Sequence, residues 1–156
     1  MRTFIAPYAI EVEKFFRLVL FNYLIHNGDA HLKNFSLIRD SGKGIYVLAP
    51  AYDLLNTRLH LPHESDTALD LFKDDFSTHS FTANAFYAKD DFLEFGNRVG
   101  IRTERVRAFL VEFASKAQRV EELLGRSYLE TDYRSEYAGY VKDRIKRISY
   151  SLRDSA

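Results

Sequence analysis

Residues 27–38, NGDAHLKNFSLI, place an acid, a histidine, a lysine and an amide within a few positions of one another. Asp29 opens this polar group and Asn34 closes it, at the start of an apolar run. Asn and Gly, which begin the stretch, tolerate the left-handed backbone that ends a helix. The stretch is therefore expected to join a helix to a strand.

A β-hairpin is expected to follow. Apolar runs at 34–39 and 45–49 are separated by DSGKG, which suits a flexible turn. Pro50 lacks a backbone donor and should end the second strand, and Asp53 comes shortly after it. Because a hairpin brings its two open ends together, the residues before the first strand and after the second should meet.

Asp29, Asn34 and Asp53 would therefore converge. Two carboxylates and an amide oxygen are hard ligands that suit Mg²⁺, which usually completes its shell with waters and phosphate oxygens. An acid that is not used as a ligand can orient a hydroxyl and accept its proton. Lys33 could balance the charge on a transferring phosphoryl group. These are the parts that phosphoryl transfer needs.

The same residues resemble a known family. Asp29 to Asn34 matches the Asp-x-x-x-x-Asn catalytic loop of the protein-kinase-like fold, and Asp53 stands where its metal-binding Asp would follow a hairpin. More narrowly, NGDAHLKNFSLI and YVLAPAYDLLNT, followed by ESDTALDLF, resemble the C-terminal lobe of HipA-family serine/threonine kinases. These kinases are the toxins of bacterial toxin–antitoxin pairs. The specific motifs lie within residues 22–75.

The resemblance implies a role for each of these side chains. Asp29 would be the catalytic base, and Asn34 and Asp53 would be the Mg²⁺ ligands. Lys33 would lie near the phosphates of ATP, and His31 would brace the loop through hydrogen bonds. ATP and Mg²⁺ are the implied cofactors, and the implied acceptor is a serine or threonine hydroxyl of a protein, such as a translation-related enzyme.

The resemblance also implies a fold class. It is a mainly α-helical C-terminal lobe of a protein-kinase-like fold, formed as a single domain over residues 1–156, with a small β-hairpin carrying the catalytic and metal-binding loops. A kinase of this fold also needs an N-terminal lobe with a phosphate-covering loop, and no Gly-rich stretch precedes Asp29. We therefore expect that the missing lobe comes from a longer chain or a separate protein, or that this chain does not turn over alone, and an antitoxin is a second expected partner.

The rest of the chain reads as helices around one long loop. Three- and four-residue spacing of apolar side chains predicts helices over 9–26, 103–125 and 131–152. A further helix is predicted over 89–100, because acidic residues stand at the start of that segment. Residues 58–88 show no sustained period, so a long loop with short helical pieces is expected there. The aromatic side chains at helical spacing should form the core; they include Phe15, Phe16, Phe109 and Phe113.

Composition excludes several classes of protein. The 156 residues are 46% hydrophobic and 15% aromatic, which suits a globular protein with a real core. With 22 basic and 22 acidic residues the formal net charge is zero, so no direct nucleic-acid partner is expected. The absence of cysteine excludes disulfides and thiolate sites. No apolar run is long enough for a membrane span or a signal peptide, and we expect a cytoplasmic protein.

Histidines offer a second interpretation. His26, Asp29 and His31 have the types and spacing of metal ligands, as a metal-dependent hydrolase would use, and such an enzyme would need no ATP. His60 and His63 lie in the irregular loop. The simpler interpretation is that each histidine side chain is either hydrogen-bonded within the protein or exposed to solvent.

Other interpretations stay open. The pattern Gly28-Asp29-x-His31-x-x-Asn34 is similar to one in aminoglycoside phosphotransferases, so a small-molecule kinase would share it. A module that binds nucleotide or a partner without catalysis would keep the same residues. Asn-Gly-Asp could also be only a helix stop, and Asp53 only an acid that caps a loop.

The last predicted helix is rich in charge. Its basic side chains, Lys142, Arg144, Lys146 and Arg147, are expected to form a solvated face, and the alternative is that they meet a partner.

Overall fold

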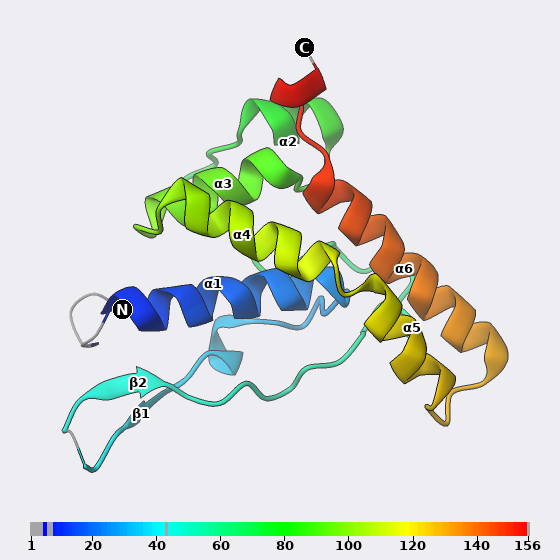
Figure 1. Ribbon diagram of the computed structural model, residues 1–156, viewed down its shortest axis with the longest axis horizontal. Helices are drawn as coiled ribbons and strands as arrows, with labels where there is room; N and C mark the ends of the chain where they lie inside the picture. Colours follow the sequence, from blue (N-terminus) through cyan, green and yellow to red (C-terminus); the bar gives the residue numbers. More distant parts are fainter. Residues whose placement is uncertain (1–4, 6–7, 43, 156) are drawn as a thin grey trace.

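The structure, a computed structural model, describes residues 5, 8–42 and 44–155. It is mainly helical, with one small hairpin at the edge of the molecule (Figure 1). The helices are α1 (Tyr8–Leu24), α2 (His79–Asn84), α3 (Lys89–Arg98), α4 (Thr103–Ala114), α5 (Ala117–Gly125) and α6 (Thr131–Ser149), the short 3-10 turns are η1 (Leu32–Asn34) and η2 (Arg153–Ser155), and the strands are β1 (Leu37–Arg39) and β2 (Tyr46–Leu48).

The core forms where α1 packs against α3 and α4. Phe16 of α1 is fully buried, and its ring lies 5.6 Å from that of Phe95 and 6.0 Å from that of Phe109. Each such side chain stabilises the fold by about 1.5–3 kcal/mol through burial. Phe15 and Phe113 are partly buried against the same cluster. The predicted aromatic core is therefore confirmed.

Helices α3 and α4 approach closely at a glycine. A Cβ added to Gly96 would collide with the side chain of Val106, which is fully buried. At the start of α3, the Asp91 carboxylate accepts a hydrogen bond of 2.7 Å from the backbone of Ala88. The carboxylate thus bonds a backbone N–H at the start of the helix, consistent with the helix start predicted from the two acidic residues there.

The hairpin is shorter than predicted. Its register pairs Leu37 with Leu48, and residues 32–34 form the 3-10 turn η1 instead of the start of a strand. Glu11 of α1, a buried acid, anchors the hairpin because its Oε2 accepts the backbone N–H of Leu48 at 2.7 Å. The ring of Phe35 packs on α1 from the same side.

The predicted helix over 103–125 is two helices. It breaks at Ser115, whose hydroxyl bonds the backbone carbonyl of Glu112 at 2.7 Å, while the Lys116 amide bonds the carbonyl of Phe113 at 3.1 Å. These three-residue bonds replace the α-helical ones and let the chain turn between α4 and α5.

The last helix is also shorter than the predicted 131–152, since α6 ends at Ser149. Beyond it, the hydroxyl of Ser151 and the amide of Leu152 both bond the buried carboxylate of Asp90, at 2.8 and 2.9 Å. These bonds draw the chain away from the helix axis onto the start of α3.

The long loop behaves as predicted. It contains one short helix, α2, whose first turn is capped where the Phe81 amide donates to the hydroxyl of Thr78 at 3.0 Å. The chain between β2 and α2 runs below α1 in Figure 1 and then passes behind the helices.

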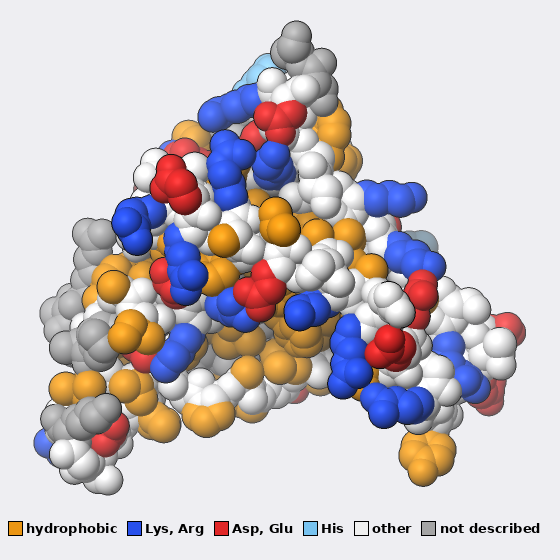
Figure 2. All heavy atoms as spheres, viewed as in Figure 1, with side chains coloured by type: hydrophobic (Ala, Val, Ile, Leu, Met, Phe, Trp, Pro, Cys, Tyr) orange, Lys and Arg blue, Asp and Glu red, His pale blue; other side chains and the backbone are white. Residues whose placement is uncertain are grey.

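Charges of both signs cover the surface. On the face in Figure 2, Lys and Arg side chains lie among Asp and Glu. One such ion pair joins Arg17 to Glu112 at 2.7 Å. None of the described helices has both the length and the apolar character that crossing a membrane requires.

Candidate active site

Asn34 and Asp53 lie in direct contact. The Asn34 Nδ2 donates a hydrogen bond to the Asp53 Oδ2 at 2.6 Å. Asn34 sits on η1 and is buried, whereas Asp53 is exposed and takes a left-handed backbone with a φ of 55°. The hairpin thus joins the residue before its first strand to one after its second, as the sequence argument expected of its open ends.

Asp29 joins this pair through Asn27. The Asp29 amide donates to the Asn27 Oδ1 at 3.2 Å, and the Asn27 Nδ2 donates to the backbone carbonyl of Asp53 at 2.9 Å. The same Nδ2 donates to the Asn22 Oδ1 on α1 at 2.8 Å. One buried amide therefore ties the loop carrying Asp29, the residue Asp53 and α1 together.

Asn27 is not among the site residues predicted from the sequence. The Asn-Gly-Asp run was expected only to end a helix, and the backbone does turn there, since α1 ends at Leu24 and His26 has a φ of 56°. Asparagine is common at such turns for its backbone alone. Only the bonds to Asn22 and Asp53, from elsewhere in the structure, reveal its second role.

The Asp29 side chain faces solvent. It is 50% exposed, and the His31 Nε2 lies 3.4 Å from its Oδ1. The backbone around it is tightly turned, because the His31 amide bonds the Asp29 carbonyl at 2.7 Å and the Asn34 amide bonds the His31 carbonyl at 2.9 Å. A partner molecule can therefore reach the carboxylate of Asp29, and His31 lies beside it.

Lys33 lies on η1, next to Asn34. Its side chain is exposed and forms no ion pair with an acid in the described part of the chain. Its backbone carbonyl accepts the hydroxyl of Tyr52 at 2.7 Å, which holds η1 against the residue before Asp53.

The loop rests on residues that follow the hairpin. The Gly28 amide donates to the hydroxyl of Thr57 at 2.8 Å, and the His26 carbonyl accepts the Thr57 amide at 3.0 Å. The hydroxyl of Thr57 also bonds the carboxylate of Glu64. That carboxylate packs so closely over Gly28 that a Cβ there would collide with it.

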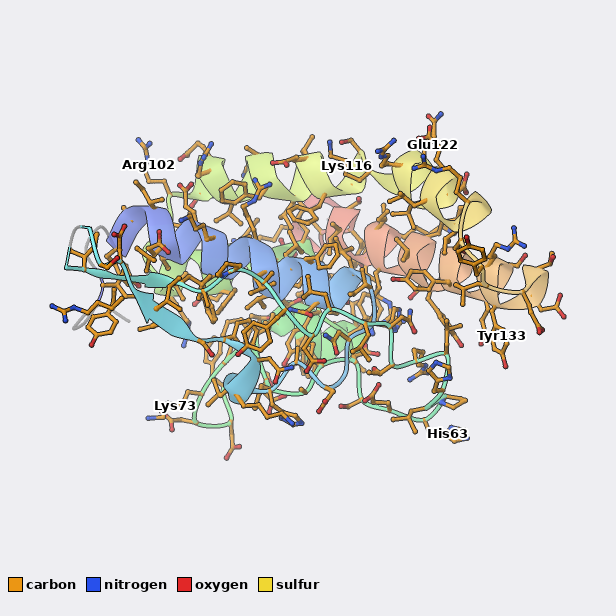
Figure 3. The ribbon with its side chains drawn as sticks, turned by 90° about the horizontal axis from the view of Figure 1, so that it is seen from below. His63, Lys73, Arg102, Lys116, Glu122 and Tyr133 are labelled. Atoms are coloured by element: carbon orange, nitrogen blue, oxygen red, sulfur yellow. The ribbon has the colours of Figure 1, made fainter. Side chains whose placement is uncertain are left out.

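The histidines do not form a metal centre. Among the described residues, no three His, Asp or Glu side chains are grouped as metal ligands. His26 is buried and bonds a guanidinium, whereas His60 and His63 are exposed. Figure 3 shows His63 at the outer edge of the loop. These histidine side chains are therefore hydrogen-bonded or exposed, as the simpler interpretation expected.

The predicted solvated face of α6 is confirmed for Lys142 and Lys146, which are exposed, and is wrong for the two arginines. Arg144 is fully buried, and the side chain of Arg147 is only 24% exposed. Both guanidiniums bind the carboxylate of Asp66, which comes from the long loop. The sequence argument treated these arginines as surface groups because Asp66 lies far from them along the chain.

Burial and charge change the acid–base behaviour of this cluster. Burial, helped by the charge of Arg144, lowers the pKa of His26 to about 4. Burial alone would raise the pKa of Asp66, but hydrogen bonding to Arg144 and the charges of both arginines hold it below its usual value. His26 is therefore neutral and Asp66 ionised at neutral pH.

The side chains of Asn34 and Asp53 carry oxygen atoms that suit a hard divalent cation, although the contact between them is made by the Asn34 Nδ2. An amide and a carboxylate supply oxygen ligands, and Mg²⁺ commonly takes one or two protein ligands and fills its shell with water and phosphate. The donor set therefore fits Mg²⁺ and lacks the imidazole or thiolate that softer metals favour.

Comparison with known proteins identifies relatives for the chain. A family model described as the HipA-like C-terminal domain matches residues 1–120. A Haemophilus influenzae protein named "Putative kinase" is 28% identical over 122 residues, which cover 73% of this chain. A Sinorhizobium fredii protein named "Putative kinase Y4dM" is 46% identical over 59 residues, 38% of this chain and 14% of its own length.

The fold also matches a solved structure. A chain of the Shewanella oneidensis MR-1 toxin–antitoxin complex of HipA, HipB and operator DNA superposes with a TM-score of 0.68 over 88% of this chain, at 23% identity. The present chain spans 35% of the Haemophilus protein and 32% of the Shewanella chain. The helical fold with its small hairpin thus matches part of a HipA structure. Since the family model covers most of its length, this chain belongs to the HipA-like C-terminal domain family.

Proposed function

We propose that the chain is the catalytic C-terminal lobe of an ATP- and Mg²⁺-dependent kinase that phosphorylates a serine or threonine hydroxyl of a protein. The observation that carries the proposal is the contact of Asn34 with Asp53, which Asn27 ties to the loop of Asp29. Membership of a family whose relatives are named as kinases supports nucleotide chemistry at this contact.

Asp29 is proposed as the catalytic base. Its carboxylate is half exposed, so an acceptor hydroxyl can approach it, donate a hydrogen bond and give up its proton as phosphate is transferred. The tight turn over residues 29–34 fixes the direction in which this carboxylate projects. His31, beside it, is proposed to brace the loop.

Asn34 and Asp53 are proposed as the Mg²⁺ ligands. When bound, the cation would neutralise charge on the phosphates of ATP. The left-handed backbone of Asp53 aims its carboxylate back at η1, and the bond between Asn27 and the Asp53 carbonyl keeps that backbone in place. Lys33, exposed on η1, is free to move toward a phosphate and is proposed as a secondary contact.

The remaining parts of the kinase are proposed to come from elsewhere. Residues 1–156 would form one C-terminal lobe, and a phosphate-covering N-terminal lobe would come from a longer chain or a second protein. The Shewanella HipA structure contains HipB and operator DNA. By analogy, an antitoxin is the proposed partner of this protein, and the cytoplasm its proposed location.

The proposal is tested by thermal unfolding of the chain with and without excess Mg-ATP. A ligand at about a hundred times its dissociation constant adds roughly 2.7 kcal/mol to the free energy of unfolding. We expect stabilisation of the wild type and of Asp74→Asn, and its loss in Asp53→Asn. Asp74 is a matched control, because it is also an exposed aspartate with a left-handed backbone, at a φ of 59°. Equal stabilisation of Asp53→Asn and the wild type would contradict the proposal, whereas no stabilisation in any variant would mean that the N-terminal lobe is needed to hold the nucleotide.

A further inference from the structure

Helix α6 carries an arginine that reaches the loop of Asp29 from outside the matched family region. The family model ends at residue 120, and α6 begins at Thr131. We infer that Arg144 of α6 is a positioning residue for this loop and acts through His26. The inference rests on the proposed function only in treating the loop as catalytic, since the contacts themselves do not depend on it.

Arg144 is fully buried and uses its whole guanidinium. Its Nε donates to the His26 Nε2 at 2.9 Å, and its terminal nitrogens bind the Asp66 carboxylate at 2.6 and 2.9 Å. The guanidinium carbon lies 4.2 Å from the ring centre of Tyr23 on α1. One side chain thus connects α6, the end of α1 and the long loop.

His26 is held in the form that this contact needs. A ring nitrogen can accept a hydrogen bond only when it is unprotonated, and burial lowers the pKa of His26 to about 4. The ring also packs against Tyr140 of α6, with ring centres 5.1 Å apart. These contacts with α6, and that of an Arg144 terminal nitrogen at 3.3 Å from the His26 Nδ1, hold the imidazole of a residue whose backbone is left-handed.

The backbone of His26 passes this constraint to the loop. Its carbonyl accepts the amide of Thr57, and the Thr57 hydroxyl accepts the amide of Gly28. Asp29 is the next residue. The route from the guanidinium of Arg144 to the proposed base therefore consists of short hydrogen bonds between buried groups.

Stability alone is a weak reason for such a residue. A buried ion pair often contributes no more to stability than apolar side chains of the same size, because both charges lose their hydration. What apolar side chains cannot supply is direction, since they make no bond to a particular nitrogen of His26. The arrangement therefore fits a residue that fixes geometry.

Arg147 provides the matched control. It lies one turn along α6 and binds the same Asp66 at 2.8 Å, and none of its hydrogen bonds and ion pairs reaches His26. Replacing either arginine by methionine removes a charge from the same acid. Only Arg144→Met removes the bond to His26.

The test is hydrogen exchange of backbone amides in the complete chain. We expect the amides of Gly28 and Asp29 to exchange about tenfold faster in Arg144→Met than in Arg147→Met, with the amides of α3 unchanged in both. Arg144→Lys should recover the ion pair with Asp66 but not the slow exchange, because lysine lacks the Nε fork. Equal exchange in the two methionine variants, or full recovery by lysine, would overturn the inference.

Two further measurements keep the test decisive. If Arg144→Met does not fold, His26→Asn takes its place, since asparagine accepts a left-handed backbone and is too short to reach Arg144. This variant should speed the exchange of the Gly28 and Asp29 amides. Unchanged exchange at these two amides would overturn the inference. Where phosphate transfer is measurable, Arg144→Met should lower kcat with little change in KM for ATP, and an effect on KM alone would overturn it. The hydrogen-exchange result does not depend on phosphate transfer, so failure of the proposed function can be distinguished from failure of this inference.

Discussion

The Asn27 side chain donates a hydrogen bond of 2.9 Å to the backbone carbonyl of Asp53. This bond joins the turn that follows α1 to the segment that follows the hairpin. Asn27 also accepts the amide of Asp29, and Asp53 also accepts the side chain of Asn34. The spacing of the proposed base and metal ligands thus depends on an amide that takes no part in the chemistry itself.

Replacing Asn27 by alanine should therefore reduce both stability and ligand binding. The change leaves the buried Asn22 Oδ1 and the part-buried Asp53 carbonyl without their donor, and an unsatisfied buried group costs about 1–3 kcal/mol. Urea unfolding measures the loss. The control is Asn97→Ala on the exposed face of α3, which should change stability by less than about 0.5 kcal/mol. If Asn27→Ala lowers the free energy of unfolding no more than Asn97→Ala does, the Asn27 hydrogen bonds do not stabilise the fold.

Replacing Asp29 by alanine should slow phosphate transfer by about 10²- to 10⁴-fold, because a general base is lost. The affinity for Mg-ATP should stay nearly the same, since Asp29 is not a proposed ligand. Transfer rates and nucleotide titrations on the same preparation separate the two effects. An unchanged rate in an assay where the wild type is active would remove Asp29 from the base role.

Burial of neutral His26 should make stability fall in mild acid. Its pKa is about 4 in the folded protein and 6.5 ordinarily. Between about pH 6.5 and pH 4, His26 is protonated in the unfolded chain but stays neutral in the folded protein. The free energy of unfolding should therefore drop across that window, by on the order of 3 kcal/mol.

Urea unfolding at several pH values from 7.5 to 4 measures this drop. His26→Asn should be less stable at neutral pH but should lose most of the slope in this window, whereas His63→Asn, at an exposed site, should keep it. The same slope in His26→Asn would mean that other groups cause the acid sensitivity.

Two glycine substitutions should act in opposite directions. Gly96→Ala forces a methyl group against buried Val106 and should cost about 1–3 kcal/mol through overpacking. Gly139→Ala, on α6 with open space around it, should stabilise the protein by about 0.5–1 kcal/mol, because alanine favours a helix. Thermal unfolding of both variants is sufficient. Similar effects of the two changes would contradict the close approach of α3 and α4.

The local parts of the fold could be predicted from the sequence. A hairpin needs only neighbouring residues, so the proximity of Asn34 to Asp53 follows from two apolar runs and a turn. The family resemblance rested on the same segment and was confirmed by the match over residues 1–120. The helices followed from apolar spacing, apart from their ends.

The errors all involve long-range or competing contacts. Arg144 was assigned to a solvated face because nothing near it along the chain shows that Asp66 and His26 surround it. The break at Ser115 was missed because apolar spacing continues across it, while the hydroxyl of Ser115 bonds the preceding turn. Periodicity describes one face of a helix and gives no information about such bonds.

The central claim is that Asn34 and Asp53 hold a divalent cation. The most direct test adds Mn²⁺, a paramagnetic substitute for Mg²⁺, with ATP to the isotopically labelled chain and records the broadening of its amide signals. The account predicts broadening centred on residues 34 and 53 in the wild type and in Asp74→Asn, and its loss in Asp53→Asn. Broadening that is centred elsewhere, or that persists unchanged in Asp53→Asn, would contradict it.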